Sequence, residues 1–90
     1  MTSPHRIALD GEYDLARKDE IEGLFDSVDG DGAVVIDCSN VTYLDSTFLK
    51  ELAKLRRRSS DRPISLTGVN DNIRRVLEIV GFARLFDIVE

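Results

Sequence analysis

The sequence predicts a single small α/β domain, in which a mostly parallel four-stranded sheet packs against three helices. Segments with the apolar pattern of strands alternate along the chain with segments whose apolar residues recur at helical spacing. The run at 33–36 is continuously apolar and rich in β-branched residues, which is typical of a parallel strand covered on both faces. The chain has 90 residues, enough for one domain and not two, so we assign 1–90 to one domain.

The four strands are expected at 6–10, 33–36, 64–67 and 85–89. The first alternates weakly between apolar and polar residues and ends at Gly11, whereas the third alternates cleanly. Right-handed crossovers between successive strands then imply a mainly parallel sheet.

Each of the three helices is expected to follow a capping side chain and to present one apolar face. The caps are Asp14, a residue of Asp45-Ser46-Thr47, and Asn70. The apolar faces, in chain order, comprise Ile21, Leu24, Phe25 and Val28; Leu49, Leu52, Ala53 and Leu55; and Ile73, Val76, Leu77 and Val80. Gly81 suits the C-terminal exit of the third helix.

Charge and composition argue against several classes of function. Residues 1–45 carry 11 acidic and 3 basic side chains, whereas residues 46–90 carry 9 basic and 6 acidic ones. The basic run 56–58 ends a helical stripe and has no interleaved aromatic residue to stack on bases, so we expect no direct contact with nucleic acid. No apolar run approaches the ~20 residues of a membrane span. With its one cysteine, Cys38, the chain suits a reducing compartment, and we expect it in the cytoplasm.

No pattern in the sequence predicts catalysis, a metal site or a cofactor. The run 29–32, Asp-Gly-Asp-Gly, resembles the start of a calcium loop, but the twelfth position is Asn40 where a carboxylate is required. We therefore interpret 29–32 as a turn. His5 and Cys38 are isolated, and no glycine-rich phosphate loop occurs. We expect a protein that is not an enzyme.

Asp45-Ser46-Thr47 joins the second strand to the second helix. Asp45 alone can cap this helix, because its carboxylate can accept a hydrogen bond from a first-turn amide and its charge suits the helix dipole. Capping by Asp45 leaves the hydroxyl of Ser46 without an assigned role.

The stretch Val35–Thr47 resembles the signature of STAS domains, and more closely that of bacterial anti-sigma factor antagonists. It combines an apolar strand, the Asp-x-Ser of Asp37–Ser39, a short turn containing Tyr43, and Asp-Ser-Thr. The segments 11–14 and 80–86 resemble two further marks of the family. The resemblance covers nearly the whole chain in matching order and implies a STAS-like fold.

This resemblance implies a transcription regulator that binds an anti-sigma factor with a serine kinase fold. It assigns phosphorylation to Ser46, with Thr47 as the fallback; phosphorylation abolishes binding and a phosphatase restores it. The residues expected to contact the partner are Glu12, Tyr43, Asp45, Ser46, Thr47 and Phe48. The alternative is a STAS assembly subunit, not phosphorylated, of a membrane transport or signalling complex.

Phe48 and Lys50 stand where the family has glycines. If Leu49 faces the core, Phe48 lies about 100° further round the helix, on the side that a partner would approach. An outward ring favours an altered partner or a lost kinase reaction, whereas a ring folded onto Leu52 belongs to the local core. The family usually has an extra strand before the first one and often a final helix, so we expect a minimal member.

Overall fold

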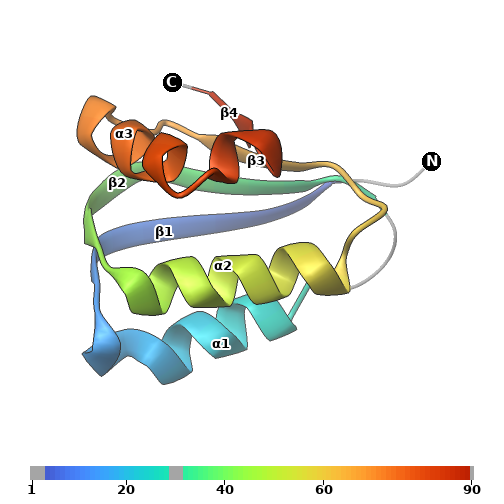
Figure 1. The fold of residues 1–90 in the computed structure, drawn as a ribbon. Coiled ribbons are helices and arrows are strands. Elements are labelled where there is room, and N and C mark those ends of the chain that lie inside the picture. The colour runs from blue at the N-terminus through green and yellow to red at the C-terminus, as the bar shows by residue number, and fades with distance from the viewer. Residues whose placement is uncertain (1–3, 29–31, 90) are drawn as a thin grey trace.

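The computed structural model describes residues 4–28 and 32–89 of the 90-residue chain. Within them the chain alternates strands and helices (Figure 1). The elements are β1 (His5–Tyr13), η1 (Leu15–Arg17), α1 (Lys18–Asp26), β2 (Val34–Leu44), α2 (Ser46–Arg58), β3 (Ile64–Thr67), α3 (Asp71–Ile79), η2 (Phe82–Arg84) and β4 (Asp87–Ile88), of which η1 and η2 are short 3-10 helices. The expected α/β class is confirmed. Residues 29–31 of the expected turn lie outside the described residues.

The four strands lie side by side in chain order, β1-β2-β3-β4, and every pair is parallel. The register aligns Ile7, Ile36, Leu66 and Ile88 in one apolar row across the sheet. The strand order runs in one direction across the sheet, and each connection between neighbouring parallel strands is a right-handed crossover. The three helices α1, α2 and α3 therefore cover the same face of the sheet. Figure 1 shows α1 and α2 side by side below β1, and α3 near β2 and β3 in the upper part of the view.

The other face of the sheet carries no helix of the described part of the chain. One row across it consists of Arg6, Val35, Ser65 and Asp87, all exposed or half-buried. The expectation that 33–36 is covered on both faces is therefore wrong. Val34 and Ile36 are buried, but Val35 points to the open face, where its β-branched side chain still suits an extended backbone.

The core lies between the apolar face of the sheet and the helices. The buried apolar side chains of the helices are Ile21 and Phe25 of α1, Phe48, Leu52 and Leu55 of α2, and Ile73 and Leu77 of α3. The expected apolar faces are thus correct at their centres. Leu24, Val28 and Leu49 lie at the margin of the core. Val76 and Val80 are exposed.

Two caps outside the β2–α2 junction act as expected. The carboxylate of Asp14 accepts a hydrogen bond from the amide of Ala16 at 3.0 Å, although η1 rather than α1 follows it directly. The side chain of Asn70 accepts from the amide of Ile73 at 2.9 Å. Gly81 ends α3 with a φ of 83°, a conformation that favours glycine.

β1 is longer than expected and continues past Gly11 to Tyr13. Its register with β2 shifts between Ala8 and Asp10 and again between Gly11 and Glu12, each time with one extra residue on β2, and Gly11 has a φ of 76°. Between these two shifts the amide of Asp10 donates to the hydroxyl of Tyr13 at 2.9 Å. β2 is also longer than expected, reaching Leu44, whereas β4 is shorter than the expected 85–89.

We expect Leu52→Ala to lower the free energy of unfolding by about 2–5 kcal/mol, because it deletes fully buried atoms and leaves a cavity between α2 and the sheet. The matched control is Leu15→Ala, whose side chain is 69% exposed and whose truncation should cost less than about 0.5 kcal/mol. Urea denaturation measures both. Equal effects of the two changes would mean that the buried face of α2 is wrongly assigned.

Candidate functional site

The candidate site is the junction between β2 and α2, at the edge of the sheet where the carboxyl ends of the strands lie. Asp45 is extended there, and its carboxylate accepts a hydrogen bond from the amide of Thr47 at 2.8 Å. Ser46, the first residue of α2, is exposed, and no residue that the structure describes hydrogen-bonds to its hydroxyl. Asp45 therefore caps the helix, and Ser46 presents a free hydroxyl to solvent.

The structure brings most of the expected site residues together at this edge. Glu12 is exposed and lies opposite Tyr43 in the register of β1 and β2. Tyr43 is 51% exposed. Asp45 follows two residues later, and its amide donates to the carbonyl of Tyr13 at 3.1 Å. Glu12, Tyr43, Asp45 and Ser46 thus lie at the same end of the sheet.

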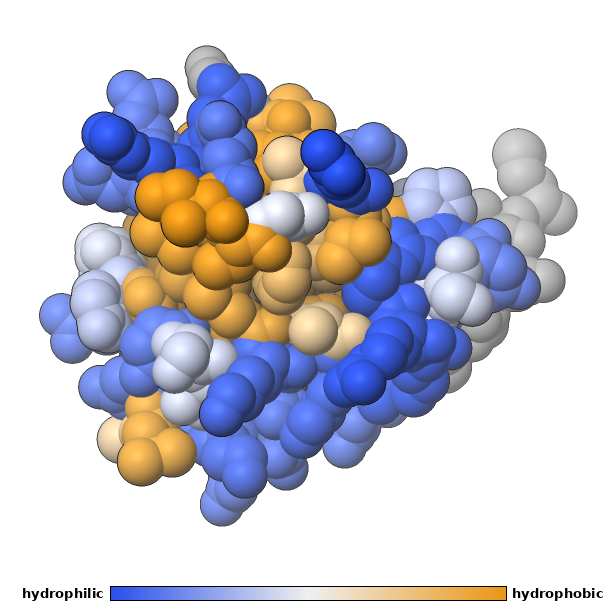
Figure 2. Space-filling model, in the orientation of Figure 1, coloured by the Kyte–Doolittle hydropathy of each residue, from blue (hydrophilic) through white to orange (hydrophobic). Residues whose placement is uncertain are grey.

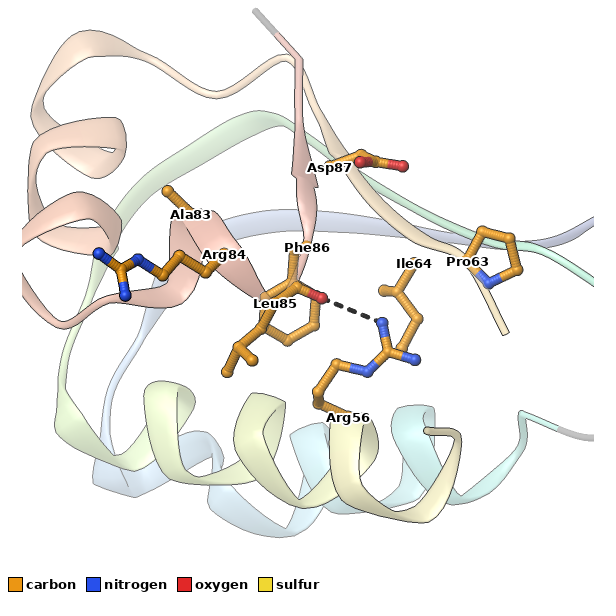
Figure 3. A pocket seen from close by; sticks show the side chains of 8 residues that line it. All are labelled: Arg56, Pro63, Ile64, Ala83, Arg84, Leu85, Phe86 and Asp87. Carbon is orange, nitrogen blue, oxygen red and sulfur yellow. Dashed lines mark hydrogen bonds between the residues drawn. The ribbon is translucent and has the colours of Figure 1, made fainter. Parts of the chain in front are cut away.

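Ser46 and Thr47 project from α2 about 100° apart, and Lys50, one turn further on, projects between them. The flank of Ser46 continues through Leu49, Ala53 and Arg56 towards η2, where the guanidinium of Arg56 donates to the carbonyl of Leu85 at 3.0 Å (Figure 3). Thr47 is half-buried on the flank that faces η1 and α1. There it lines a groove of about 190 Å³ with Leu15, Lys18, Lys50, Glu51 and Lys54.

Phe48 corrects one expectation. Its side chain is 1% exposed, and its ring centroid lies 5.5 Å from that of Tyr13 and 5.9 Å from that of Phe25. The prediction of an outward ring that contacts a partner is therefore wrong, and the ring belongs to the local core. The physical reason is that α2 docks through Phe48, Leu52 and Leu55, which places Leu49 at the margin.

Asp37 and Ser39 of the Asp-x-Ser signature form a local hydrogen-bonded unit in β2. The carboxylate of Asp37 accepts from the hydroxyl of Ser39 at 2.7 Å and from its amide at 2.9 Å. These bonds lower the pKa of the Asp37 carboxyl, the hydroxyl bond most of all. Gly68 packs directly on this unit, since a Cβ at Gly68 would lie 2.6 Å from the Cβ of Ser39, and its φ is 67°.

Sequence reasoning missed Arg17, which organises the exposed end of β1. Its guanidinium donates to the carbonyls of Asp10 at 2.6 Å and Glu12 at 3.2 Å, pairs with the carboxylate of Glu20, and lies 4.1 Å from the centroid of the Tyr13 ring. The bond to Arg17 holds the pKa of the Glu20 carboxyl below its usual range. The sequence feature that could have drawn attention to Arg17 is that it is one of only three basic residues in 1–45.

The described residues provide little for catalysis or metal binding. Nowhere among them do three His, Cys, Asp or Glu side chains gather in a way that could hold a metal ion. Cys38 is buried, and burial raises the pKa of its thiol to about 12, so the thiol stays protonated and unreactive at neutral pH. No helix in 4–28 or 32–89 has the length and apolar character needed to cross a bilayer.

Comparison with known proteins decides the family, because the model described as "Mlab, STAS domain" matches residues 2–90. The chain belongs to the STAS domain family. It is 29% identical to the anti-sigma-B factor antagonist of Staphylococcus aureus over 92 residues, which cover 96% of this chain and 83% of that protein. It is 31% identical over 85 residues to a STAS-domain containing protein of Pseudomonas aeruginosa, covering 91% of this chain and 84% of that protein.

Solved STAS structures share the fold of this chain. A sulfate transporter family protein from Wolinella succinogenes superposes with a TM-score of 0.78 at 16% identity, over 96% of this chain and 75% of that one. The STAS domain of a SulP transporter from Vibrio cholerae gives a TM-score of 0.72, also at 16% identity, over 97% and 73%. At this identity the likeness concerns the fold. The family itself places the chain among regulatory and binding domains.

We expect Phe48→Ala to lower the free energy of unfolding by about 3–5 kcal/mol, because it removes a buried ring that contacts Tyr13 and Phe25. Tyr43→Ala is the control, since truncating its half-exposed ring should cost no more than about 1 kcal/mol. Urea unfolding followed by circular dichroism compares the two. A cost for Phe48→Ala no larger than that of the control would contradict the core assignment.

Asp37 should contribute a stabilisation that depends on pH. Because its pKa is lowered on folding, this contribution is present above the pKa of the unfolded carboxyl, about 3.9, and is lost as the pH falls through the folded pKa. The stability difference between wild type and Asp37→Asn should therefore be largest at neutral pH and shrink in acid. The stability difference between wild type and Ser39→Ala, which removes the strongest donor to Asp37, should show the same dependence on pH. Urea titrations across this pH range test the trend, and a difference independent of pH would rule it out.

Proposed function

We propose that this protein is a binding switch of the anti-sigma factor antagonist type. With Ser46 unmodified it binds an anti-sigma factor with a serine kinase fold; phosphorylation of Ser46 releases that partner, and a phosphatase restores binding in the cytoplasm. The observation that carries the proposal is the free, exposed hydroxyl of Ser46 beside Asp45, which already caps α2. The name of the Staphylococcus aureus relative supports the class of partner.

A phosphate on Ser46 is compatible with the fold. It would carry about −1.5 to −2 charges, and the first amides and the dipole of α2 favour negative charge at this end. The effect would fall on the partner, which would have to bury a charge without compensation at a cost of several kcal/mol. Since about 1.4 kcal/mol changes affinity tenfold, this is enough to abolish the complex.

Ser46 suits this role better than Thr47. Thr47 is half-buried, and its groove contains Glu51, which is 5% exposed and pairs with Lys54 at 3.0 Å. A phosphate on Thr47 would lie near this buried carboxylate on the α1 side of the helix. Ser46 does not line this groove and is exposed, at the end of the sheet that also carries Tyr43 and Glu12.

The second candidate is a STAS assembly subunit that is not phosphorylated. It is favoured by the departure from the family glycines at 48 and 50. Burial of the Phe48 ring weakens this argument, because the ring does not obstruct a partner. Lys50 is exposed on α2 and remains the departure that a partner would meet.

The switch predicts opposite binding by two variants that should both fold. Ser46→Ala should retain the partner constitutively, and Ser46→Asp should bind it weakly, because it places one negative charge where phosphate places nearly two. Pull-downs from the native cytosol with both variants, followed by identification of the bound protein, measure the difference. Ser60→Ala, at an exposed serine just beyond the other end of α2, is the matched control and should bind and release like wild type.

The captured partner, once purified, should modify Ser46 when incubated with the wild-type protein and ATP, and mass spectrometry locates the site. Modification of Thr47 alone would move the assignment by one residue. No modification, together with equal capture by Ser46→Ala and Ser46→Asp, would remove the switch and favour the assembly subunit.

A further inference from the structure

One surface between α2 and α3 combines exposed apolar side chains with cations, and we call it the α2–α3 surface. Its apolar members are Tyr43, Leu49, Val76, Ile79 and Leu85, and its cations are Lys50, Arg57, Arg75 and Arg84. Figure 2 shows an apolar region over α3 and towards α2, with hydrophilic residues around it. An apolar area of this kind on a small domain indicates an interaction site.

Several apolar side chains of this surface remain outside the core and are exposed to solvent. α3 buries Ile73 and Leu77, but Val76 and Ile79 occupy the flank nearest the end of β2, and Ile79 is 76% exposed. Val76 and Tyr43 line the same groove, of about 210 Å³. Leu85, 44% exposed, extends from the segment after η2 towards α2 (Figure 3).

The cations around the surface lack the acidic partners that cations elsewhere on the domain have. On the α1 side of α2, Lys54 pairs with Glu51 at 3.0 Å, and Arg58 pairs with Asp26 at 2.8 Å. No carboxylate of the described residues pairs with Lys50, Arg57, Arg75 or Arg84, all of which are exposed. The α2–α3 surface therefore has an apolar centre and a rim of cations that form no ion pair with the described carboxylates.

This charge pattern selects the occupant. A second copy joined face to face would bring like charges together. The acidic α1 side of a second copy offers Leu15 as its exposed large apolar side chain, too little to fill the groove. A lipid surface would need a broad protruding apolar face, whereas Tyr43 and Val76 line a groove.

We propose that the α2–α3 surface binds an amphipathic helix of the partner, whose apolar face is flanked by Asp and Glu side chains. This inference rests on the proposed function, because Ser46 heads the same flank of α2. A phosphate there would repel the acidic flanks of the helix. It would also attract Lys50, four residues further along α2, and so remove one cation from the rim.

The test is a titration of two designed helical peptides of about 18 residues, or five turns, into the full chain labelled with ¹⁵N. Both carry leucines at i, i+3, i+4 and i+7; one has glutamates beside this stripe and its twin has lysines. The glutamate peptide should bind at least about tenfold more tightly and shift amide signals of Leu49, Val76 and Ile79. Equal affinities, shifts confined to other surfaces, or no binding of the glutamate peptide at about 1 mM would overturn the proposal.

Matched variants locate the contact. Ile79→Ser and Arg75→Glu should each weaken the glutamate peptide by at least about fivefold. Leu15→Ser, which changes a similarly exposed apolar residue on the α1 side, should leave its affinity unchanged, and an equal loss for Leu15→Ser would overturn the proposal. Binding to phosphatidylglycerol vesicles that Ile79→Ser abolishes, without peptide binding, would assign the surface to lipid instead.

Ser46→Asp separates this inference from the switch. Weaker binding of the glutamate peptide by Ser46→Asp supports both. Peptide binding at the α2–α3 surface that Ser46→Asp leaves unchanged supports the docking surface and counts against the phosphorylation switch.

Discussion

The site depends on the two backbone contacts that Asp45 makes at the junction of β2 and α2. Its amide donates to the carbonyl of Tyr13 at 3.1 Å, which ties the junction to β1, and its carboxylate accepts from the amide of Thr47 at 2.8 Å, which starts α2. Together they set the rotation of α2 about its axis. That rotation sends Phe48 onto Tyr13 and leaves Ser46 in solvent, so burial of the ring and exposure of the hydroxyl have one cause.

The two halves of the chain differ in charge, and this difference gives the two sides of α2 different electrostatic surroundings. Acidic side chains of α1 meet basic ones of α2 where the helices pack, as in the contacts of Arg58 with the carboxylate of Asp26 and the carbonyl of Phe25. On the other side of α2 and on α3, no carboxylate of the described residues pairs with Arg57 or Arg75. The positive rim of the α2–α3 surface is therefore what remains after the helices pair.

Local patterns predicted the elements and the caps, because a cap or an apolar stripe depends on residues a few positions apart. They failed where distant residues decide. In α2 the expected face of Leu49, Leu52, Ala53 and Leu55 has helical spacing, and so does the observed set of Phe48, Leu52 and Leu55. The contacts that distinguish them are those of Asp45 with β1 and of Phe48 with the rings of Tyr13 and Phe25. The open face beside Val35 likewise follows from pairing across the sheet, which spacing along the chain does not reveal. The network of Arg17 depends on the turn between β1 and η1, which brings the guanidinium back onto the carbonyls of Asp10 and Glu12.

The departure from the family glycines has a different meaning at each position. At 48 the side chain is buried, so the change concerns packing between α2, β1 and α1. At 50 the side chain is exposed and lies one turn beyond Ser46, where a cation can pair with a phosphate at i+4. On the proposed mechanism, Lys50 attracts acidic side chains of the partner in the free state and is engaged by the phosphate in the modified state. The same lysine would thus strengthen both states of the switch, which makes it a specificity feature of this chain and no obstacle to the reaction.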